Sequence, residues 1–222
     1  MKRLRVTLDI AMTVLMPLLM AYSLIGETFH EVIGTLIFIL FIIHHVLNRK
    51  WSGALFKGRY SPDRVFRTGI NALLFVFMIL QPLSGILMSK HLYTFLPSLS
   101  LSAQARSVHM LMAYWGYVLL SIHAGTHLTA PLAKMRRNRS GAFTLLMAVL
   151  AAASLYGAYA FVKRGFPEYL FAKTMFAFFD YSEPVLLFLL DYLAVMAACM
   201  MIGWLLLSGL NRIRVGKKNQ RS

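Results

Sequence analysis

The sequence predicts an all-α, polytopic membrane protein with six transmembrane helices, from its composition, its apolar stretches and the distribution of its basic residues. Of 222 residues, 59% are hydrophobic and only 14% are charged. The mean hydropathy is +0.64. A soluble domain rarely combines so many apolar residues with so few charges. We therefore expect a single membrane domain over residues 1–222, without a separate soluble domain.

Six apolar stretches are long enough to cross a hydrocarbon core, which needs about 20 residues per helix. In chain order they are residues 8–25, 31–47, 68–89, 107–128, 141–162 and 184–210. Gly26 allows a tight turn between the first two stretches, so we expect antiparallel neighbours there. The Ser-Pro-Asp at 61–63 marks the turn into the third stretch, and the Leu-Pro-Ser at 96–98 marks the turn before the fourth.

The basic residues are distributed unevenly between the two sides of these spans. With the N-terminus inside, five of the 23 Lys and Arg residues fall in outer segments and the other eighteen fall in inner segments. Short loops rich in Lys and Arg stay in the cytoplasm. We therefore expect both termini in the cytoplasm. Topology then explains most of the net charge of +15, and we expect no nucleic-acid partner.

The first basic residues also resemble the start of a signal peptide, because Lys2, Arg3 and Arg5 precede an apolar run. No small-residue cleavage site of the A-x-A kind follows that run. The six spans already give a consistent topology, so we favour a first transmembrane helix.

Four histidines form two pairs with the same fourteen-residue spacing, His30 with His44 and His109 with His123. Fourteen helical residues turn through about 1400°, within about 40° of four full turns, and rise roughly 21 Å. Each helix therefore presents two imidazoles on one face. Both helices are expected to run from outside to inside, so His30 meets His109 near the outer surface and His44 meets His123 near the inner surface. This pattern favours bis-imidazole ligation of two haem b groups.

All seven histidines lie within or beside the first four spans, and none lies in the last two. We interpret residues 8–128 as a four-helix haem-binding bundle and residues 141–210 as a flanking two-helix hairpin. The aromatic, amphipathic segment FPEYLFAKTMFAFFD at 166–180 is predicted to lie along the outer membrane interface. Gly34, Gly116 and Gly125 lie near histidines, and helix packing explains them slightly better than contact with a macrocycle.

Two further histidines leave the inner ligand pair open. His44 and His123 match each other in rise, whereas a ligand at His127 would lie about 27 Å along the axis from His109. We expect His45 and His127 to lie behind the ligands, near haem propionates or a substrate, or to replace His44 or His123.

A metal site is the alternative chemistry for the inner histidines. His123 and His127 are four residues apart, a spacing typical of zinc ligands, and His44 with His45 would complete a cluster. The protein would then be a metal transporter or a metallohydrolase. That interpretation leaves His30 and His109 unexplained.

His91 and Asp191 are candidate proton acceptors at a quinol site. His91 follows the third span on the outer side, and Asp191 lies two turns into the sixth. Each has a structural alternative, because His91 with Lys90 also suits the membrane interface and Asp191 also suits pairing with a neighbouring helix. Asp9 can reach Arg5 one helical turn away, so we expect an ion pair there.

Four runs of residues carry a family resemblance: LDIAMTVLMPLLMAYSLIGETFHEVIG, FIIHHVLNRKW, SGILMSKHLYTFLP and ARSVHMLMAYWGYVLLSIHAGTH. They cover roughly residues 8–128. They resemble a bacterial domain-of-unknown-function family of histidine-rich membrane proteins, which is grouped with di-haem cytochrome b-like electron carriers. The resemblance implies haem b at His30, His44, His109 and His123, in a bacterial cytoplasmic membrane. The paired-histidine motif is specific for haem but not for substrate.

The resemblance also implies redox partners, and the expected function is transmembrane electron transfer by a di-haem b cytochrome. Electrons would pass between membrane menaquinone or ubiquinone and an extracytosolic flavoprotein or a cytoplasmic flavodoxin-like protein. The chain would act as a quinol-dependent oxidoreductase or as a non-enzymatic subunit of a larger complex. Ferric-reductase-type proteins share the two-helix design but usually carry flavin and nicotinamide domains. This sequence contains no G-x-G-x-x-G loop for a dinucleotide.

Overall fold

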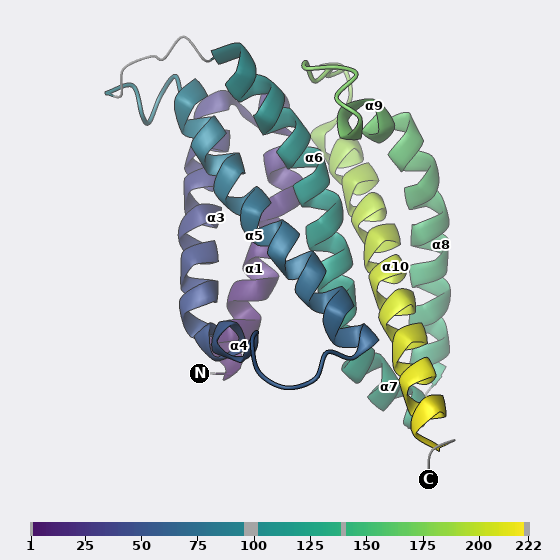
Figure 1. The fold of residues 1–222 in the computed structure, drawn as a ribbon. Helices are drawn as coiled ribbons and strands as arrows, with labels where there is room; N and C mark the ends of the chain where they lie inside the picture. The colour runs from purple at the N-terminus through teal and green to yellow at the C-terminus, as the bar shows by residue number, and fades with distance from the viewer. Residues whose placement is uncertain (1, 96–101, 139–140, 220–222) are drawn as a thin grey trace.

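The computed structural model describes residues 2–95, 102–138 and 141–219, and its regular elements there are all helices. In chain order they are α1 (Lys2–Met20), α2 (Tyr22–Ile25), α3 (Glu27–Leu47), α4 (Arg49–Ala54), α5 (Pro62–Met88), α6 (Ser102–His127), α7 (Thr129–Arg137), α8 (Gly141–Lys163), α9 (Phe166–Leu170) and α10 (Val185–Asn219). The long helices stand side by side, and the short α4, α7 and α9 lie at their ends (Figure 1). The predicted all-α class is confirmed.

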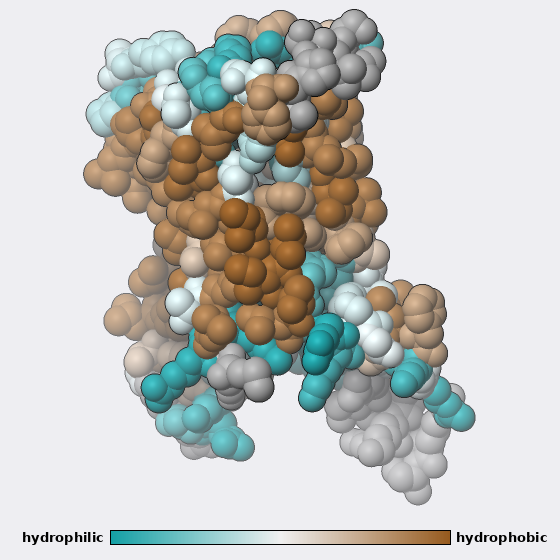
Figure 2. All heavy atoms as spheres, turned by 90° about the vertical axis from the view of Figure 1, so that its left-hand side faces the viewer, coloured by the Kyte–Doolittle hydropathy of each residue, from teal (hydrophilic) through white to brown (hydrophobic). Residues whose placement is uncertain are grey.

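Four of the long helices, α3, α5, α8 and α10, are long and apolar enough to cross a membrane. Figure 2 shows a belt of apolar atoms between two hydrophilic ends. The other two predicted spans are also helical, at α1–α2 and at α6. They are less apolar, because α1 begins with basic residues and α6 contains three histidines among other polar groups. The helices therefore support a membrane protein.

Long helices that follow one another along the chain run in opposite directions, and both chain ends lie at the same end of the bundle (Figure 1). Helices α3 and α6 consequently run parallel. Gly26 makes the predicted tight turn before α3 with a φ of +98°, a conformation that glycine adopts readily. Ser61 is extended and Pro62 begins α5, which confirms the second predicted turn. The third, at 96–98, lies outside the described residues.

The main apolar core lies where α6 meets α9 and α10. It contains Tyr117, Phe166 and Val195, each fully buried. Helices α6 and α10 approach so closely that a Cβ on Gly125 would lie 2.0 Å from the carbonyl oxygen of Met200. Helix packing is therefore the role of Gly125. The last two long helices do form a hairpin, but α10 lies between α8 and α6 rather than at the edge of the molecule.

The segment 166–180, predicted to lie along the outer membrane interface, is buried in part against protein. Only Phe166–Leu170 is helical, and Phe166 and Tyr169 are buried. Tyr169 stacks on Tyr114 with ring centroids 4.1 Å apart, and Trp115 Nε1 donates to the Leu170 carbonyl at 2.9 Å. The aromatic residues of α9 thus pack against α6, because amphipathicity marks a buried face without indicating whether lipid or protein covers it.

Candidate functional site

His30 and His109 face each other from α3 and α6, and we call them the first histidine pair. Their ring centroids lie 6.1 Å apart with an angle of 65° between the ring planes. Nδ1 of His30 lies 3.0 Å from the Leu19 carbonyl oxygen. A carbonyl can only accept, so it selects the tautomer with a proton on Nδ1. Nε2 of His30 is left with its lone pair for a ligand.

His109 packs against one turn of α5, residues 81–85. Its Nδ1 lies 3.2 Å from both the Gln81 carbonyl oxygen and the Ser84 hydroxyl, and its Nε2 lies 3.1 Å from the Gln81 amide nitrogen. A Cβ on Gly85 would lie 3.2 Å from Cε1 of His109, which is tighter than ordinary contact. Sequence reasoning missed these α5 residues. The signal was present, because Gln81 and Ser84 are polar residues within an apolar span.

The Gln81 side chain beside the first histidine pair also contains a buried polar atom without a hydrogen bond among the described residues. Its Oε1 atom is buried and has no hydrogen-bond partner in the described part of the chain. An unsatisfied buried polar atom costs about 1–3 kcal/mol. Buried polar atoms in native proteins usually have a partner, so Gln81 is an incompletely satisfied side chain beside the two imidazoles.

The second histidine cluster consists of His44 and His45 at the end of α3 and His123 and His127 at the end of α6. Nε2 of His123 and Nε2 of His127 lie 3.3 Å apart, and the His44 and His45 ring centroids lie 5.4 Å apart. Because α3 and α6 run parallel, the two pairs lie toward the same end of the bundle (Figure 1).

His44 and His45 differ in how they are held. Nδ1 of His44 lies 2.7 Å from Oδ1 of Asp9 on α1, whereas Nδ1 of His45 lies 3.0 Å from the Phe41 carbonyl oxygen. The expected Asp9–Arg5 pair is replaced by this contact, because α1 packs on α3 and brings His44 to the carboxylate. A carboxylate behind a ligating histidine orients the ring and raises its basicity. Asp9 is thus a further functional candidate, besides the α5 residues, that the sequence pattern did not indicate.

The spacing of the first histidine pair fits a bis-histidine haem. Two imidazoles that bind one metal from opposite sides at about 2 Å have ring centroids about 6 Å apart, and the first pair has 6.1 Å. In the described ranges, no three His, Cys, Asp or Glu side chains form a group that could hold a metal ion. At the first site the donors form one facing pair, which is the number of axial ligands that a bis-histidine haem takes.

No protein-family model, curated protein or solved structure matches this chain.

His91 lies at the same end of the bundle as the first pair, in a small ionic cluster. Its Nε2 is 3.6 Å from the Glu27 carboxylate, and Lys90 Nζ donates to both Glu27 oxygens at 3.1 Å. Glu31, one residue after His30, accepts from the backbone N–H of Lys90 and of Leu92. These contacts tie the segment after α5 to the start of α3.

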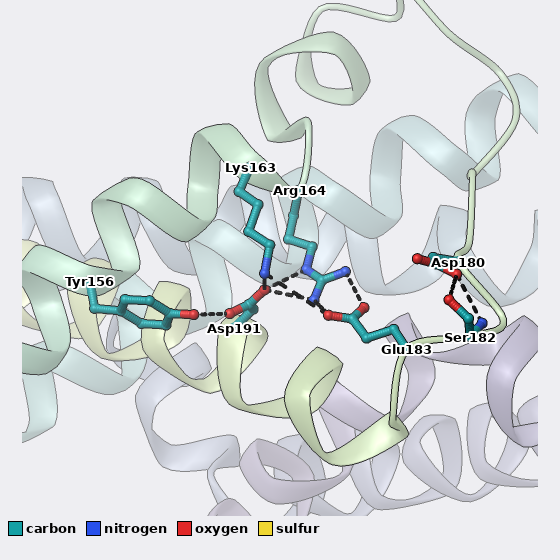
Figure 3. Close-up of polar contacts among 7 residues, drawn as sticks. All are labelled: Tyr156, Lys163, Arg164, Asp180, Ser182, Glu183 and Asp191. Carbon is teal, nitrogen blue, oxygen red and sulfur yellow. Dashed lines mark hydrogen bonds and ion pairs between the residues drawn. The ribbon is translucent and has the colours of Figure 1, made fainter.

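Asp191 lies elsewhere, on α10, and its carboxylate faces Tyr156 and Lys163 of α8 and the adjoining Arg164 (Figure 3). It is 1% exposed and accepts hydrogen bonds from Tyr156 Oη at 2.5 Å, Lys163 Nζ at 2.8 Å and Arg164 Nε at 2.7 Å. Arg164 also donates twice to Glu183, at 2.8 and 2.7 Å, in the fork geometry that strengthens such pairs. The structure does not bring Asp191 together with His91. Pairing between neighbouring helices accounts for its contacts.

Proposed function

We propose that this chain is a membrane electron-transfer protein that holds two haem b groups, one between His30 and His109 and one between His44 and His123. The observation that carries the proposal is the facing of imidazoles from two parallel helices, with the first pair separated by 6.1 Å. Each bound haem would supply reversible one-electron chemistry at its iron.

The chain's own groups hold and orient the ligands. The Leu19 and Gln81 carbonyls face Nδ1 of His30 and of His109, so Nε2 of each ring would bind the iron. At His109 the Gln81 amide, 3.1 Å from Nε2, would have to give up that contact. Asp9 has the same role behind His44. Fourteen residues separate the sites along each helix, a rise of roughly 21 Å. Two sites at this spacing divide the membrane crossing into shorter steps.

The proposed topology has six passes, with both termini in the bacterial cytoplasm. Two observations support it: both termini lie at the same end of the bundle, and the basic segments lie on that side. Quinone would exchange electrons within the membrane. A flavodoxin-like protein at the basic face, or a flavoprotein at the opposite face, would be the protein partner, and a basic surface suits an acidic docking partner.

Two alternatives make different predictions. A non-enzymatic subunit would hold both haems but would not be reduced by quinol without its partner chain. A histidine-based metal transporter is favoured by one contact, the 3.3 Å between Nε2 of His123 and Nε2 of His127, since both nitrogens approach one point.

The reduced-minus-oxidised visible spectrum of the purified protein separates the haem functions from metal transport, and haem reduction by quinol without a partner chain separates the proposed function from a non-enzymatic subunit. A di-haem b protein gives the sharp bands of low-spin haem. Protein that is colourless after expression with ample haem, and that contains bound zinc, would support transport and contradict the proposal.

A further inference from the structure

A groove of about 500 Å³ opens between α8 and α10, and neither histidine site contributes to it. Its polar end contains Tyr156, Lys163 and Asp191, and its remaining lining is apolar, including Leu187, Leu190 and Leu193. These three leucines are 50%, 47% and 46% exposed, so the groove opens outward from an apolar helix pair. Its shape suits an amphipathic molecule that enters from the lipid.

The charges at the polar end are balanced. Lys163 and Arg164 face the two carboxylates of Asp191 and Glu183 (Figure 3). A phosphate headgroup would add a negative charge that no cation in this network is left to neutralise. A neutral polar head is the better match.

Two side chains at the polar end of the groove, Lys163 and Tyr156, can still form hydrogen bonds with a molecule in it. Lys163 Nζ has three N–H donors, gives one to Asp191, and its side chain is 39% exposed. Tyr156 gives its proton to Asp191, so its oxygen is left as an acceptor, and the residue is 46% exposed. A head group that fits offers a carbonyl oxygen as an acceptor for Lys163 in one state and a hydroxyl as a donor to Tyr156 in another.

Aromatic contacts join this end of the groove to the first histidine pair. Ring centroids are 5.7 Å apart for His30 and Tyr22, 5.2 Å for Tyr22 and Phe179, and 5.7 Å for Phe179 and Phe188. The Arg164 guanidinium lies 4.7 Å from the Phe188 ring centroid and bonds Asp191. The groove is thus connected to one histidine site by a continuous series of packed groups.

We infer that this groove binds an isoprenoid quinone or quinol. The Lys163 ammonium donates to a quinone carbonyl, and the Tyr156 oxygen accepts from a quinol hydroxyl. The isoprenoid tail lies along Leu187, Leu190 and Leu193. The ligand class rests on the proposed function, because a neutral, lipid-soluble redox carrier is the partner that a membrane electron-transfer protein requires.

Photolabelling tests the site without using electron transfer. The full chain in phospholipid nanodiscs is irradiated with an azidoquinone that carries a decyl tail, and labelled peptides are mapped by mass spectrometry. Label is expected on peptides containing Tyr156 and Leu190, and excess ubiquinone should remove it. Leu190→Trp fills the groove and should reduce labelling by roughly tenfold. Leu186→Trp is the matched control, since Leu186 is 66% exposed on the same helix and does not line the groove.

The outcomes separate this inference from the proposed function. Labelling that persists in a His30→Ala, His44→Ala variant without haem shows that the groove binds quinone independently of the histidine sites. Label elsewhere in the wild-type chain, or equal labelling of both tryptophan variants, would overturn the inference. Competition by phosphatidylglycerol as effective as that by ubiquinone would also overturn it and indicate a general lipid groove.

Discussion

Nδ1 of His44 lies 2.7 Å from the Asp9 carboxylate, so the first helix of the chain orients a histidine of the third. This contact distinguishes His44 from its neighbour His45, which bonds only the Phe41 carbonyl of its own helix. A histidine whose far nitrogen is held by a carboxylate is a stronger and better oriented metal ligand. The structure therefore adds a reason for choosing His44 that spacing alone did not supply.

Asp9→Asn should weaken the second haem site and leave the first unchanged. The amide keeps the shape but loses the charge behind His44, and such changes cost roughly 10–100-fold in affinity. Haem retention during dilution in detergent measures the effect. Asp180→Asn is the control, because Asp180 is exposed and bonds only Ser182. Equal retention in the two variants would remove Asp9 from the site.

Gly85→Ala should weaken the first haem site. The new Cβ would lie 3.2 Å from Cε1 of His109 and displace the imidazole. We expect roughly a tenfold loss of haem affinity at this site. The matched control is Gly69→Ala on the same helix, since a Cβ at Gly69 meets no atom within 4 Å.

The two alanine variants also separate ligand geometry from general damage. Alanine favours a helix over glycine by about 1 kcal/mol, so neither variant should lower the melting temperature through helix propensity. If Gly85→Ala retains haem as well as Gly69→Ala does, the close approach of α5 to His109 has no role in binding.

The second cluster offers four imidazoles, and the proposal assigns ligation to two of them. His44→Ala and His123→Ala should each leave about one haem per chain, whereas His45→Ala and His127→Ala should leave about two. The pyridine haemochrome assay gives these ratios. Loss of a haem from His127→Ala but not from His123→Ala would show that His127 is the ligand and that matching helical rises selected the wrong residue.

Asp191 is predicted to be important for stability. Asp191→Asn leaves Lys163 and Arg164 without the carboxylate that they share, and breaking such a buried network costs on the order of 3 kcal/mol. Thermal unfolding in detergent should show a clearly lower midpoint, with both haem spectra intact before unfolding. The surface variant Glu168→Gln should change stability by less than about 0.5 kcal/mol. An unchanged midpoint in Asp191→Asn would mean that the ion pairs contribute little.

Helical periodicity and hydropathy predicted the helices well, because a membrane helix satisfies its own backbone and must be apolar on its lipid face. The turns at Gly26 and Ser61 followed from glycine and proline chemistry. The position of α10 between α6 and α8 could not be predicted in this way. It depends on close approaches such as that of Gly125 to Met200, and a helix that is apolar on all sides does not show which side meets protein.

The histidine spacing predicted that His30 and His109 would face each other, because the helical repeat and two parallel helices are enough to align them. The pairing of His44 with His123 stays a prediction. The groups that hold those imidazoles were harder to find. Asp9, Gln81 and Gly85 act across helix–helix contacts, and no periodic pattern in one helix identifies a partner in another. Polar residues within apolar spans are the remaining sequence signal for such partners.

The ratio of haem to protein in four samples tests the central claim most directly: wild type, His30→Ala, His123→Ala and the double variant. Two independent bis-histidine sites predict ratios near two, one, one and zero by pyridine haemochrome assay, with the two single variants retaining haems of different midpoint potential. A wild-type ratio near one, or single variants that both lose all haem, would contradict the account of two separate haem sites on α3 and α6.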